Sequence, residues 1–392
     1  MSQTPEILWQ PSQEQIERTR LHDYMRWLAR HKGLEFADYH ALWEWSVHSL
    51  EAFWESIWQY FDVQAAVSYE RVLDGYDMPG AKWFEGSRLN LASQLFRFHA
   101  EEPERPAIIA RSELRLLTTL SWGELKRQVS QLAQALRRLG VQPGDRVVAY
   151  LPNLPETVVA FFACASIGAI WSSCSPDMGT RSVVDRFRQI DPKVLIAVDG
   201  YRYGGKDFDR RGVVEQLRAE LPTLQHVVLL PYLDPAARLP GAHLWTDLLQ
   251  GEAEIVIEQL PFDHPLWVVY SSGTTGLPKP IVHGHGGVLL ETLKGHALHM
   301  DLGPDDRFMW FTTTGWIMWN SQIGGLLVGS TICLYDGNPG HPDLETLWRF
   351  AGETAMTFFG AGAAYFLNCK KADIEPGKIA DLSRLRAVGF TG

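Results

Sequence analysis

Residues 266–280 read LWVVYSSGTTGLPKP, an apolar run followed at once by hydroxyl side chains, glycines and a lysine. The apolar run predicts a short buried strand, and the residues after it predict a polar loop. Gly273 and Gly276 permit close approach of the backbone to a ligand, and Lys279 adds a positive charge. Four hydroxyl groups supply further hydrogen-bond donors: Ser271, Ser272, Thr274 and Thr275. Such a loop suits the oxygens of a polyphosphate.

This loop differs from a Walker A loop, which has four residues between its first glycine and a Gly-Lys pair. Here two residues separate Gly273 from Gly276, and Pro278 precedes Lys279. Because proline disfavours helical backbone at the residue before it, a helix is not expected to begin there. The loop should therefore wrap around the phosphates. The alternative for such a Ser/Thr/Gly run is a surface linker.

The composition is that of an ordinary globular protein, with 392 residues, 46% hydrophobic and 21% charged. A chain of this length exceeds one simple core, so roughly two or three domains are expected. The net charge of −10 is spread along the sequence and indicates neither a nucleic-acid partner nor an anionic membrane surface. The longest apolar run, residues 158–171, is shorter than the roughly 20 residues of a membrane span.

Cysteine spacing and the N-terminus bear on the cellular compartment. Cys164, Cys174, Cys333 and Cys369 form no Cys-x-x-Cys pair, so they predict neither a disulfide framework nor a zinc site. The N-terminal residues MSQTPEILWQ lack the basic-then-apolar pattern of a signal peptide. We therefore expect a cytoplasmic protein in a reducing compartment, with no membrane span and no nucleic-acid partner.

The chain is predicted to fold in three parts. Residues 1–90 predict a helical, Trp-rich extension that covers the main body. A capping box at Ser12 and Gln15 begins a helix that stops at Gly33, and a second helix follows at about residues 39–61. Residues 91–260 and 261–392 predict two α/β subdomains, the second holding the phosphate loop.

Strands and helices alternate in both subdomains. Ser121 and Glu124 form another capping box, and Gly140 stands where a helix beginning there should end. Strands are expected at residues 146–151, 194–198, 227–230, 266–270, 307–311 and 331–335. This alternation predicts an α/β fold with mostly parallel sheets flanked by helices.

The run from Tyr270 to Lys279 closely resembles the signature of the adenylate-forming superfamily, which includes acyl-CoA synthetases, luciferases and peptide-synthetase adenylation domains. Pro280 departs from the glycine that usually follows. The resemblance covers nearly the whole chain, and residues 82–84 (KWF) are similar to a segment of the short-chain acyl-CoA synthetases. Within the superfamily the chain resembles the acetoacetate–CoA ligases, in residues 171–177 (WSSCSPD), 199–206 (DGYRYGGK) and 311–316 (FTTTGW).

The resemblance implies a two-step ligase reaction that uses ATP, Mg²⁺ and coenzyme A. Acetoacetate first becomes acetoacetyl-AMP, and the thiol of coenzyme A then displaces AMP to give acetoacetyl-CoA. One alternative is an acetyl-, propionyl- or other short-chain acyl-CoA synthetase. The other is an inactive nucleotide-binding fragment of such an enzyme.

The resemblance also implies roles for particular residues. Lys279 and Thr275 are the candidate catalytic residues, and Thr275 is the candidate contact for Mg²⁺, which arrives with ATP. ATP would be held by Ser271, Ser272, Gly273, Thr274, Thr275, Gly276, Lys279 and Gly392. Coenzyme A would contact Arg202 and Lys206, for which a solvated basic turn is an equal alternative. The acyl group would be bordered by Trp316, Ile317, Met318 and Thr391, with a core role for the tryptophan as the alternative.

Two further groups of residues have structural interpretations. His283 and His285 form a His-x-His pair that could bind metal, but no cysteine or histidine cluster supplies further ligands, so a structural or pocket-wall role is favoured. Arg181, Arg186 and Arg188 lie at helical spacing and predict an exposed helix face.

The resemblance implies that the family's fold continues beyond Gly392. An adenine-binding segment, a ribose-binding aspartate and a small C-terminal domain with a catalytic lysine would follow. We therefore expect a truncated chain, without the C-terminal domain, that does not complete the reaction by itself.

Overall fold

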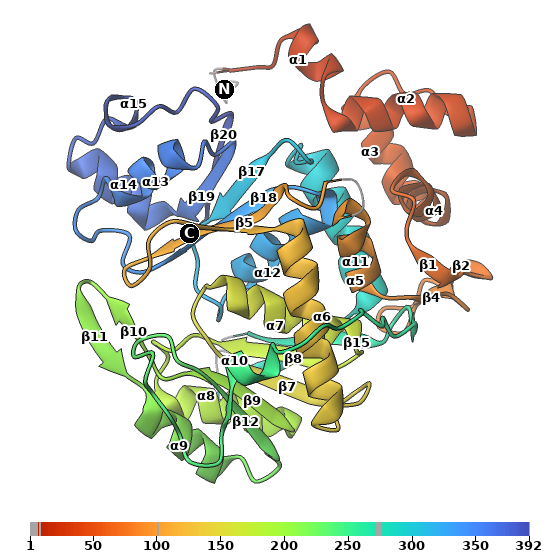
Figure 1. The fold of residues 1–392 in the computed structure, drawn as a ribbon. Helices are drawn as coiled ribbons and strands as arrows, with labels where there is room; N and C mark the ends of the chain where they lie inside the picture. The colour runs from red at the N-terminus through yellow and green to blue at the C-terminus, as the bar shows by residue number, and fades with distance from the viewer. Residues whose placement is uncertain (1–6, 8, 100–101, 272–275, 392) are drawn as a thin grey trace.

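The computed structural model describes residues 7, 9–99, 102–271 and 276–391 (Figure 1). Two large sheets carry the fold. One has seven strands in the order β13-β12-β9-β7-β8-β15-β16, and the other has six in the order β20-β19-β17-β18-β5-β6. In each sheet all neighbouring strands are parallel except at one edge. There β16 pairs antiparallel with β15 in the first sheet, and β6 pairs antiparallel with β5 in the second. The predicted α/β class with mostly parallel sheets is confirmed.

The six expected runs correspond to β7, β9, β12, β15, β17 and β18, with bounds that agree within one residue at each end. The seven-stranded sheet comprises β7 (Arg146–Tyr150), β8 (Ile170–Cys174), β9 (Val194–Val198), β12 (His226–Leu230), β13 (His243–Leu244), β15 (Pro265–Ser271) and β16 (Lys279–Gly284). The six-stranded sheet comprises β5 (Pro106–Ser112), β6 (Thr118–Ser121), β17 (Arg307–Trp310), β18 (Thr331–Asp336), β19 (Phe358–Gly362) and β20 (Ala387–Thr391).

The division between the sheets does not follow the sequence boundary expected at residue 260. β5 and β6 lie in the first predicted subdomain but join the sheet of β17–β20, where Ile108 pairs with Ile332. Conversely, β15 and β16 lie in the second predicted subdomain but extend the sheet of β7–β9. The reason is that a strand's partner is chosen by packing between distant segments, which hydrophobic periodicity within one segment does not specify.

Successive side chains of the seven-stranded sheet face different hydrophobic cores. In β7, Val147 and Ala149 belong to a core shared by the two sheets, whereas Val148 and Tyr150 belong to a core on the outer face. The shared core includes α6 (Trp122–Arg138) and α7 (Pro155–Ser166). The outer core includes α8 (Thr180–Phe187) and α9 (Arg211–Glu220). Burial on both faces is typical of parallel sheets.

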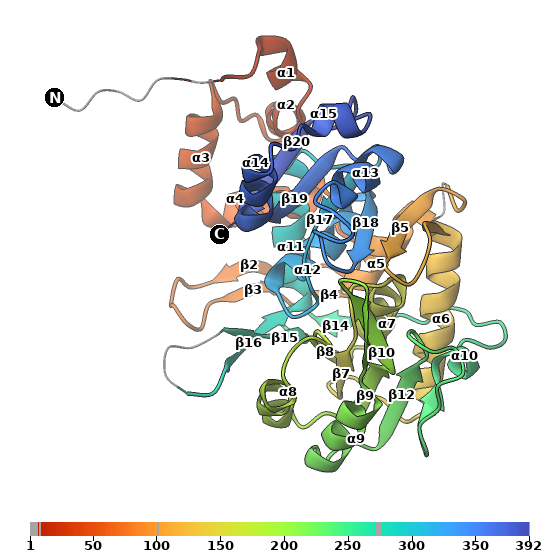
Figure 2. The same ribbon diagram turned by 90° about the vertical axis from the view of Figure 1, so that its left-hand side faces the viewer.

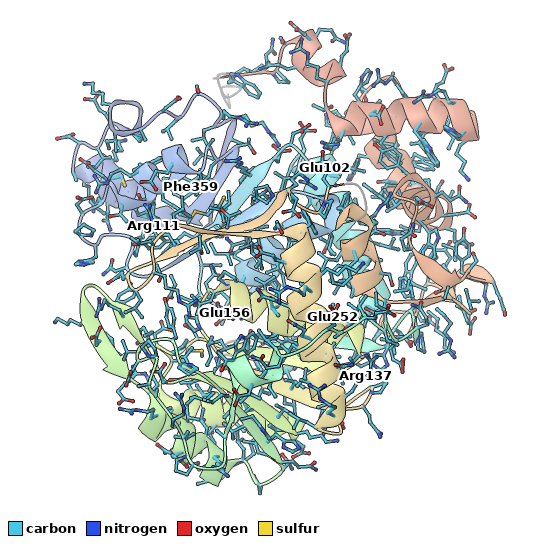
Figure 3. All side chains as sticks on the ribbon, in the orientation of Figure 1. Glu102, Arg111, Arg137, Glu156, Glu252 and Phe359 are labelled. Atoms are coloured by element: carbon cyan, nitrogen blue, oxygen red, sulfur yellow. The ribbon has the colours of Figure 1, made fainter. Side chains whose placement is uncertain are left out.

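The six-stranded sheet is covered in the same way. Phe308 in β17 faces the shared core, and Met309 faces a third core that contains Phe359 of β19 (Figure 3). The shared core also takes in α5 (Leu91–Phe96), α11 (His285–Leu293) and α12 (Ile317–Gly324). The third core takes in α13 (Thr346–Glu353) and α14 (Ala363–Lys371), with α15 (Pro376–Ile379) after it. The main body is therefore a stack of five alternating layers of helices and sheets.

The N-terminal extension is helical only in its first part. The capping box of Ser12 and Gln15 is present, and Gly33 ends the second helix with φ +65°. The helix predicted between them is broken, because the Thr19 hydroxyl caps a new helix. The helix predicted at 39–61 is also broken, at Ser49. The helices are α1 (Gln13–Glu17), α2 (Arg20–Lys32), α3 (Tyr39–His48) and α4 (Leu50–Tyr60).

Short strands, which the sequence did not predict, follow these helices. They are β1 (Ala65–Val67), β2 (Arg71–Asp74), β3 (Lys82–Glu85) and β4 (Arg88–Leu89), and β4 pairs with β14 (Leu260–Pro261) of the main body. Tyr24 and Trp58 from the helices are buried in the core shared by the two sheets. The extension thus packs along one side of the body, as Figure 2 shows. Within the described ranges, no helix has both the length and the apolar character needed to cross a membrane.

Candidate active site

The predicted phosphate loop joins two antiparallel strands at the edge of the seven-stranded sheet. Ser271, the last residue of β15, pairs with Lys279, the first residue of β16, and we call these two paired strands the phosphate hairpin. Both residues are exposed. Gly276 has φ +107°, the backbone geometry for which a glycine is needed. Four predicted ATP contacts lie outside the described residues, as does Gly392: Ser272, Gly273, Thr274 and Thr275.

A cavity of about 230 Å³, which we call the acyl cavity, lies beside this hairpin. Its wall includes Ser271 from the phosphate hairpin together with Trp316 and Ile317 from the predicted acyl segment. Trp316 is 70% exposed, whereas Trp319 is fully buried and donates its indole N–H to the Asn153 side-chain oxygen at 3.1 Å. The core alternative therefore describes Trp319 and not Trp316.

The other predicted site residues that the structure describes do not line the acyl cavity. Met318 packs partly buried against the shared core, and Thr391 is exposed in β20, where it pairs with Gly362. Lys279 is also absent from the cavity wall, although it pairs with Ser271. The structure thus brings together Ser271, Trp316 and Ile317.

Arg186 of α8 was expected on an exposed helix face, but it is half-buried and lines the acyl cavity. Its guanidinium carbon lies 5.7 Å from the centre of the Tyr270 ring, and the Tyr270 hydroxyl donates to the Arg186 carbonyl at 2.7 Å. Arg181 on the same helix has a side chain 78% exposed. Residues five apart on a helix differ in direction by roughly 140°, so the spacing itself separates these two arginines. The arginine adds positive charge to the wall of this cavity.

The two histidines of the His-x-His pair have different environments. His285 is fully buried, and burial followed by the neighbouring His264 lowers its pKa to about 3. Its Nδ1 accepts a hydrogen bond from the Leu91 backbone N–H at 3.2 Å. His283 lines the acyl cavity instead, and burial also lowers its pKa. The described part of the chain contains no group of three or more His, Cys, Asp or Glu side chains that could hold a metal ion.

Hydroxyl groups of β8 hold the acyl segment in place. Ser172 donates to the Val268 carbonyl at 2.7 Å, and Ser173 donates to the Thr314 carbonyl at 2.9 Å. The Thr314 hydroxyl in turn donates to the Leu151 carbonyl at 2.6 Å. The bond from Ser173 joins the run at 171–177 to the run at 311–316. The sequence singled out both runs but gave no signal that they are in contact.

Arg202 and Lys206 belong to a separate hairpin formed by β10 (Gly200–Tyr203) and β11 (Lys206–Asp209). The Arg202 guanidinium is paired with Asp207 at 2.6 and 3.1 Å, and Lys206 is exposed. The Glu113 carboxylate accepts hydrogen bonds from the turn of this hairpin. Neither basic residue lines the acyl cavity.

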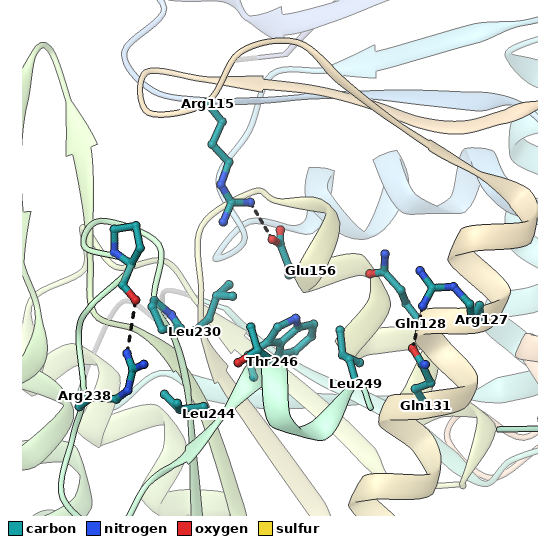
Figure 4. Close-up of a pocket in the computed structure, with 13 residues that line it drawn as sticks. Arg115, Arg127, Gln128, Gln131, Glu156, Leu230, Arg238, Leu244, Thr246 and Leu249 are labelled. Carbon is teal, nitrogen blue, oxygen red and sulfur yellow. Dashed lines mark hydrogen bonds and ion pairs between the residues drawn. The ribbon is translucent and has the colours of Figure 1, made fainter. Parts of the chain in front are cut away.

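A second cavity, of about 410 Å³, is lined by none of the predicted site residues that the structure describes (Figure 4). It is bordered by α6, α7 and α10 (Trp245–Leu248). Arg115, in the turn after β5, pairs there with Glu156 of α7 at 2.6 Å. This ion pair joins the six-stranded sheet to a helix that covers the seven-stranded sheet.

Comparisons with known proteins agree with this architecture. Residues 95–392 match the model of the AMP-binding enzyme family, and residues 39–95 match the acetyl-coenzyme A synthetase N-terminus model. The chain is 43% identical to the acetoacetyl-coenzyme A synthetase of Rhizobium meliloti (strain 1021) and 38% identical to the acetoacetyl-CoA synthetase of Danio rerio. Each match covers 98% of this chain and 59% of the relative.

A solved structure, the acetoacetyl-CoA synthetase from Streptomyces lividans, superposes with a TM-score of 0.97 at 50% identity. The match covers 99% of this chain and 60% of that chain. The chain therefore spans about 59% of the length of the curated relatives described here.

Proposed function

The chain belongs to the family of AMP-binding enzymes, and from that premise we propose that its protein activates acetoacetate with ATP and transfers the acyl group to coenzyme A. The acetoacetate carboxylate attacks the α-phosphorus of ATP, and pyrophosphate leaves with the electron pair of the broken P–O bond. The thiol sulfur of coenzyme A then attacks the acyl carbon of acetoacetyl-AMP, and AMP leaves as the thiol loses its proton. The substrates are small molecules, and the proposed location is the cytoplasm.

One observation carries this proposal. Ser271 at the end of the phosphate hairpin and Trp316 of the acyl segment line the same cavity, so the phosphates of ATP and the carboxylate of the acid would meet there. Bringing the two reactants together in a fixed geometry is a large part of catalysis in such a reaction. The relatives' printed names supply the acid, acetoacetate.

The side chains of this cavity and of the two hairpins described above suit a reaction between two anions. Lys279 on the hairpin and Arg186 on α8 would neutralise negative charge on the phosphates and the carboxylate. Trp316 and Ile317 would border the short acyl chain, and Arg202 and Lys206 would contact the phosphates of coenzyme A. Mg²⁺ would accompany ATP, with Thr275, outside the described residues, as its candidate contact.

A panel of acids tests the proposal. The protein that contains this chain, at full length, is given ATP, Mg²⁺ and hydroxylamine, and hydroxamate formation is measured with acetoacetate, acetate, propionate and butyrate. We expect acetoacetate to have the highest kcat/KM. Faster reaction with acetate or propionate would select the alternative short-chain synthetase.

For the 392-residue chain alone we make a separate proposal. It binds the nucleotide but does not complete the reaction. The chain spans 59% of the length of these two relatives, and this share motivates the second proposal. Calorimetry with ATP·Mg²⁺ measures binding, and a coupled assay for AMP measures turnover. Formation of acetoacetyl-CoA by this chain at the rate of the full-length protein would refute it.

A further inference from the structure

The acyl cavity adjoins a larger cavity of about 750 Å³. Four residues line both: Trp267, His283, Ile317 and Asn320. An acyl chain in the acyl cavity would therefore meet these four side chains where the two cavities join. A ketone on the chain needs a hydrogen-bond donor there, because a buried carbonyl oxygen without one loses the hydrogen bond it made to water.

The protonation state of His283 is set by its neighbour. The Trp267 indole N–H donates to Nδ1 of His283 at 2.9 Å. An indole nitrogen is only a donor, so Nδ1 must be the unprotonated nitrogen. Burial lowers the pKa of His283, which favours the neutral ring at pH 7. The remaining proton then sits on Nε2, for which the described residues provide no hydrogen-bond acceptor. His283 therefore offers a neutral N–H donor in a fixed tautomer.

Three hydroxyl donors in the acyl cavity are already used. The hydroxyl groups of Ser173, Thr314 and Tyr270 each donate to a backbone carbonyl. Trp171 lines the acyl cavity but not the junction with the larger one, and its buried indole N–H has no hydrogen-bond partner among the described residues. Trp316 is 70% exposed, so its N–H is available to water.

The remaining polar side chains of the acyl cavity differ in their charge and in their position. Ser271 ends the phosphate hairpin, and Arg186 is a cation suited to an anionic oxygen. Among the described residues at the junction of the two cavities, Trp267 gives its N–H to His283, which leaves His283 and Asn320 as the neutral donors. His283 is the one whose donor is oriented by a second side chain.

We propose that the Nε2–H of His283 donates a hydrogen bond to the C3 ketone oxygen of acetoacetate and thereby selects 3-keto acids over saturated acids of the same length. The inference rests on the proposed function and adds the residue that would set its specificity. A saturated acid leaves the imidazole N–H without an acceptor, and sites built for a polar group discriminate strongly against analogues that lack it.

The test compares acetoacetate with butyrate, which has the same chain length without the ketone. In the full-length protein, His283→Phe removes the donor and keeps an aromatic ring. We expect the ratio of kcat/KM for acetoacetate to that for butyrate to fall by about 10- to 100-fold, mainly through acetoacetate. His283→Gln keeps an N–H donor and should recover part of the ratio.

A variant of the neighbouring residue tests the tautomer. Trp267→Phe leaves the His283 ring in place but frees its Nδ1, so the proton can move to either nitrogen. We expect the ratio to fall by less than in His283→Phe. This variant also keeps the proposal falsifiable if His283→Phe does not fold. His299→Phe, which alters the larger cavity alone, serves as the matched control and should leave the ratio unchanged.

The outcomes separate the proposals. Equal losses for both acids in His283→Phe would overturn the ketone contact, because they would indicate a general structural role. A fall in the ratio with Asn320→Leu but not with His283→Phe would also overturn it and assign the donor to Asn320. If the proposed function is wrong, the wild-type protein will already prefer acetate or propionate to acetoacetate, before any variant is measured.

Discussion

The Glu113 carboxylate accepts a hydrogen bond at 2.8 Å from the backbone N–H of Gly204, a residue 91 positions away in the chain. Its second oxygen accepts from the Gly205 N–H at 2.7 Å, and the Asn338 N–H donates to the first at 2.7 Å. Only 5% of the Glu113 side chain is exposed. One carboxylate therefore ties the turn after β5 to the hairpin that carries Arg202 and Lys206.

We expect Glu113→Ala to lower the free energy of unfolding by about 2–3 kcal/mol, because three backbone N–H groups lose a charged acceptor. Glu113→Gln keeps an acceptor oxygen and should lose less. Urea denaturation of the purified chain measures both. Glu252→Ala, in an exposed loop, is the control. Equal denaturation midpoints for Glu113→Ala and Glu252→Ala would contradict the prediction.

Gly360 of β19 gives a steric prediction. A Cβ at this position would lie 2.2 Å from Cε3 of Trp310, at the end of β17 just before the acyl segment. Gly360→Ala must displace this ring, and such overpacking typically lowers stability by about 1–3 kcal/mol. Gly362→Ala is a matched control in the same strand, since a Cβ there meets no atom within 4 Å. Thermal unfolding should separate the two variants, and identical melting temperatures would show that the ring moves freely.

Short-range features of this fold were predictable from the sequence. The Ser121–Glu124 capping box forms both of its hydrogen bonds, and Gly140 has φ +79° just after α6. β9 was predicted with its bounds, Val194–Val198. Each signal lies within a few residues, so local hydrogen bonding and side-chain periodicity were enough.

Contacts between distant residues were not predictable. The pairing of β5 with β18 joins segments more than two hundred residues apart, and the sequence of neither strand indicates that the other is its partner. The same holds for Glu113, an isolated acidic residue in the sequence that proves to hold the hairpin turn. For the candidate site, the phosphate loop was predicted from its own residues and the segment at Trp316 by resemblance. The Trp267–His283 hydrogen bond emerged only from the folded chain.

Lys279→Ala tests the phosphate hairpin. We expect it to slow adenylation by roughly 100-fold or more, the loss expected when a charge contact to the transition state is removed. Because Lys279 is exposed, the substitution should leave the unfolding midpoint nearly unchanged. The assay is acetoacetate-dependent exchange between ATP and pyrophosphate in the full-length protein. Lys378→Ala, whose side chain is 75% exposed on α15, is the control. An exchange rate equal to that of the control would refute the role of Lys279.

His285 gives a prediction about pH. Its pKa falls from 6.5 to about 3 on folding because the ring is buried, with His264 adding to the shift. Between these values the unfolded chain binds a proton that the folded chain does not, so stability is lost as the pH falls from about 6.5 toward 3. Between pH 6.5 and pH 5 the titration of this one residue should lower the free energy of unfolding by about 2 kcal/mol.

His285→Gln removes the titrating ring and retains an acceptor for the Leu91 N–H, which the ring now accepts at 3.2 Å. Urea denaturation of both proteins at pH 7.5 and pH 5.0 gives the difference in unfolding free energy at each pH. We expect the wild-type chain to lose about 2 kcal/mol more than the variant between the two conditions. Other buried histidines, such as His296, titrate in both proteins and cancel in the difference. Parallel losses in the two proteins would mean that His285 is protonated in the folded state at pH 5.0.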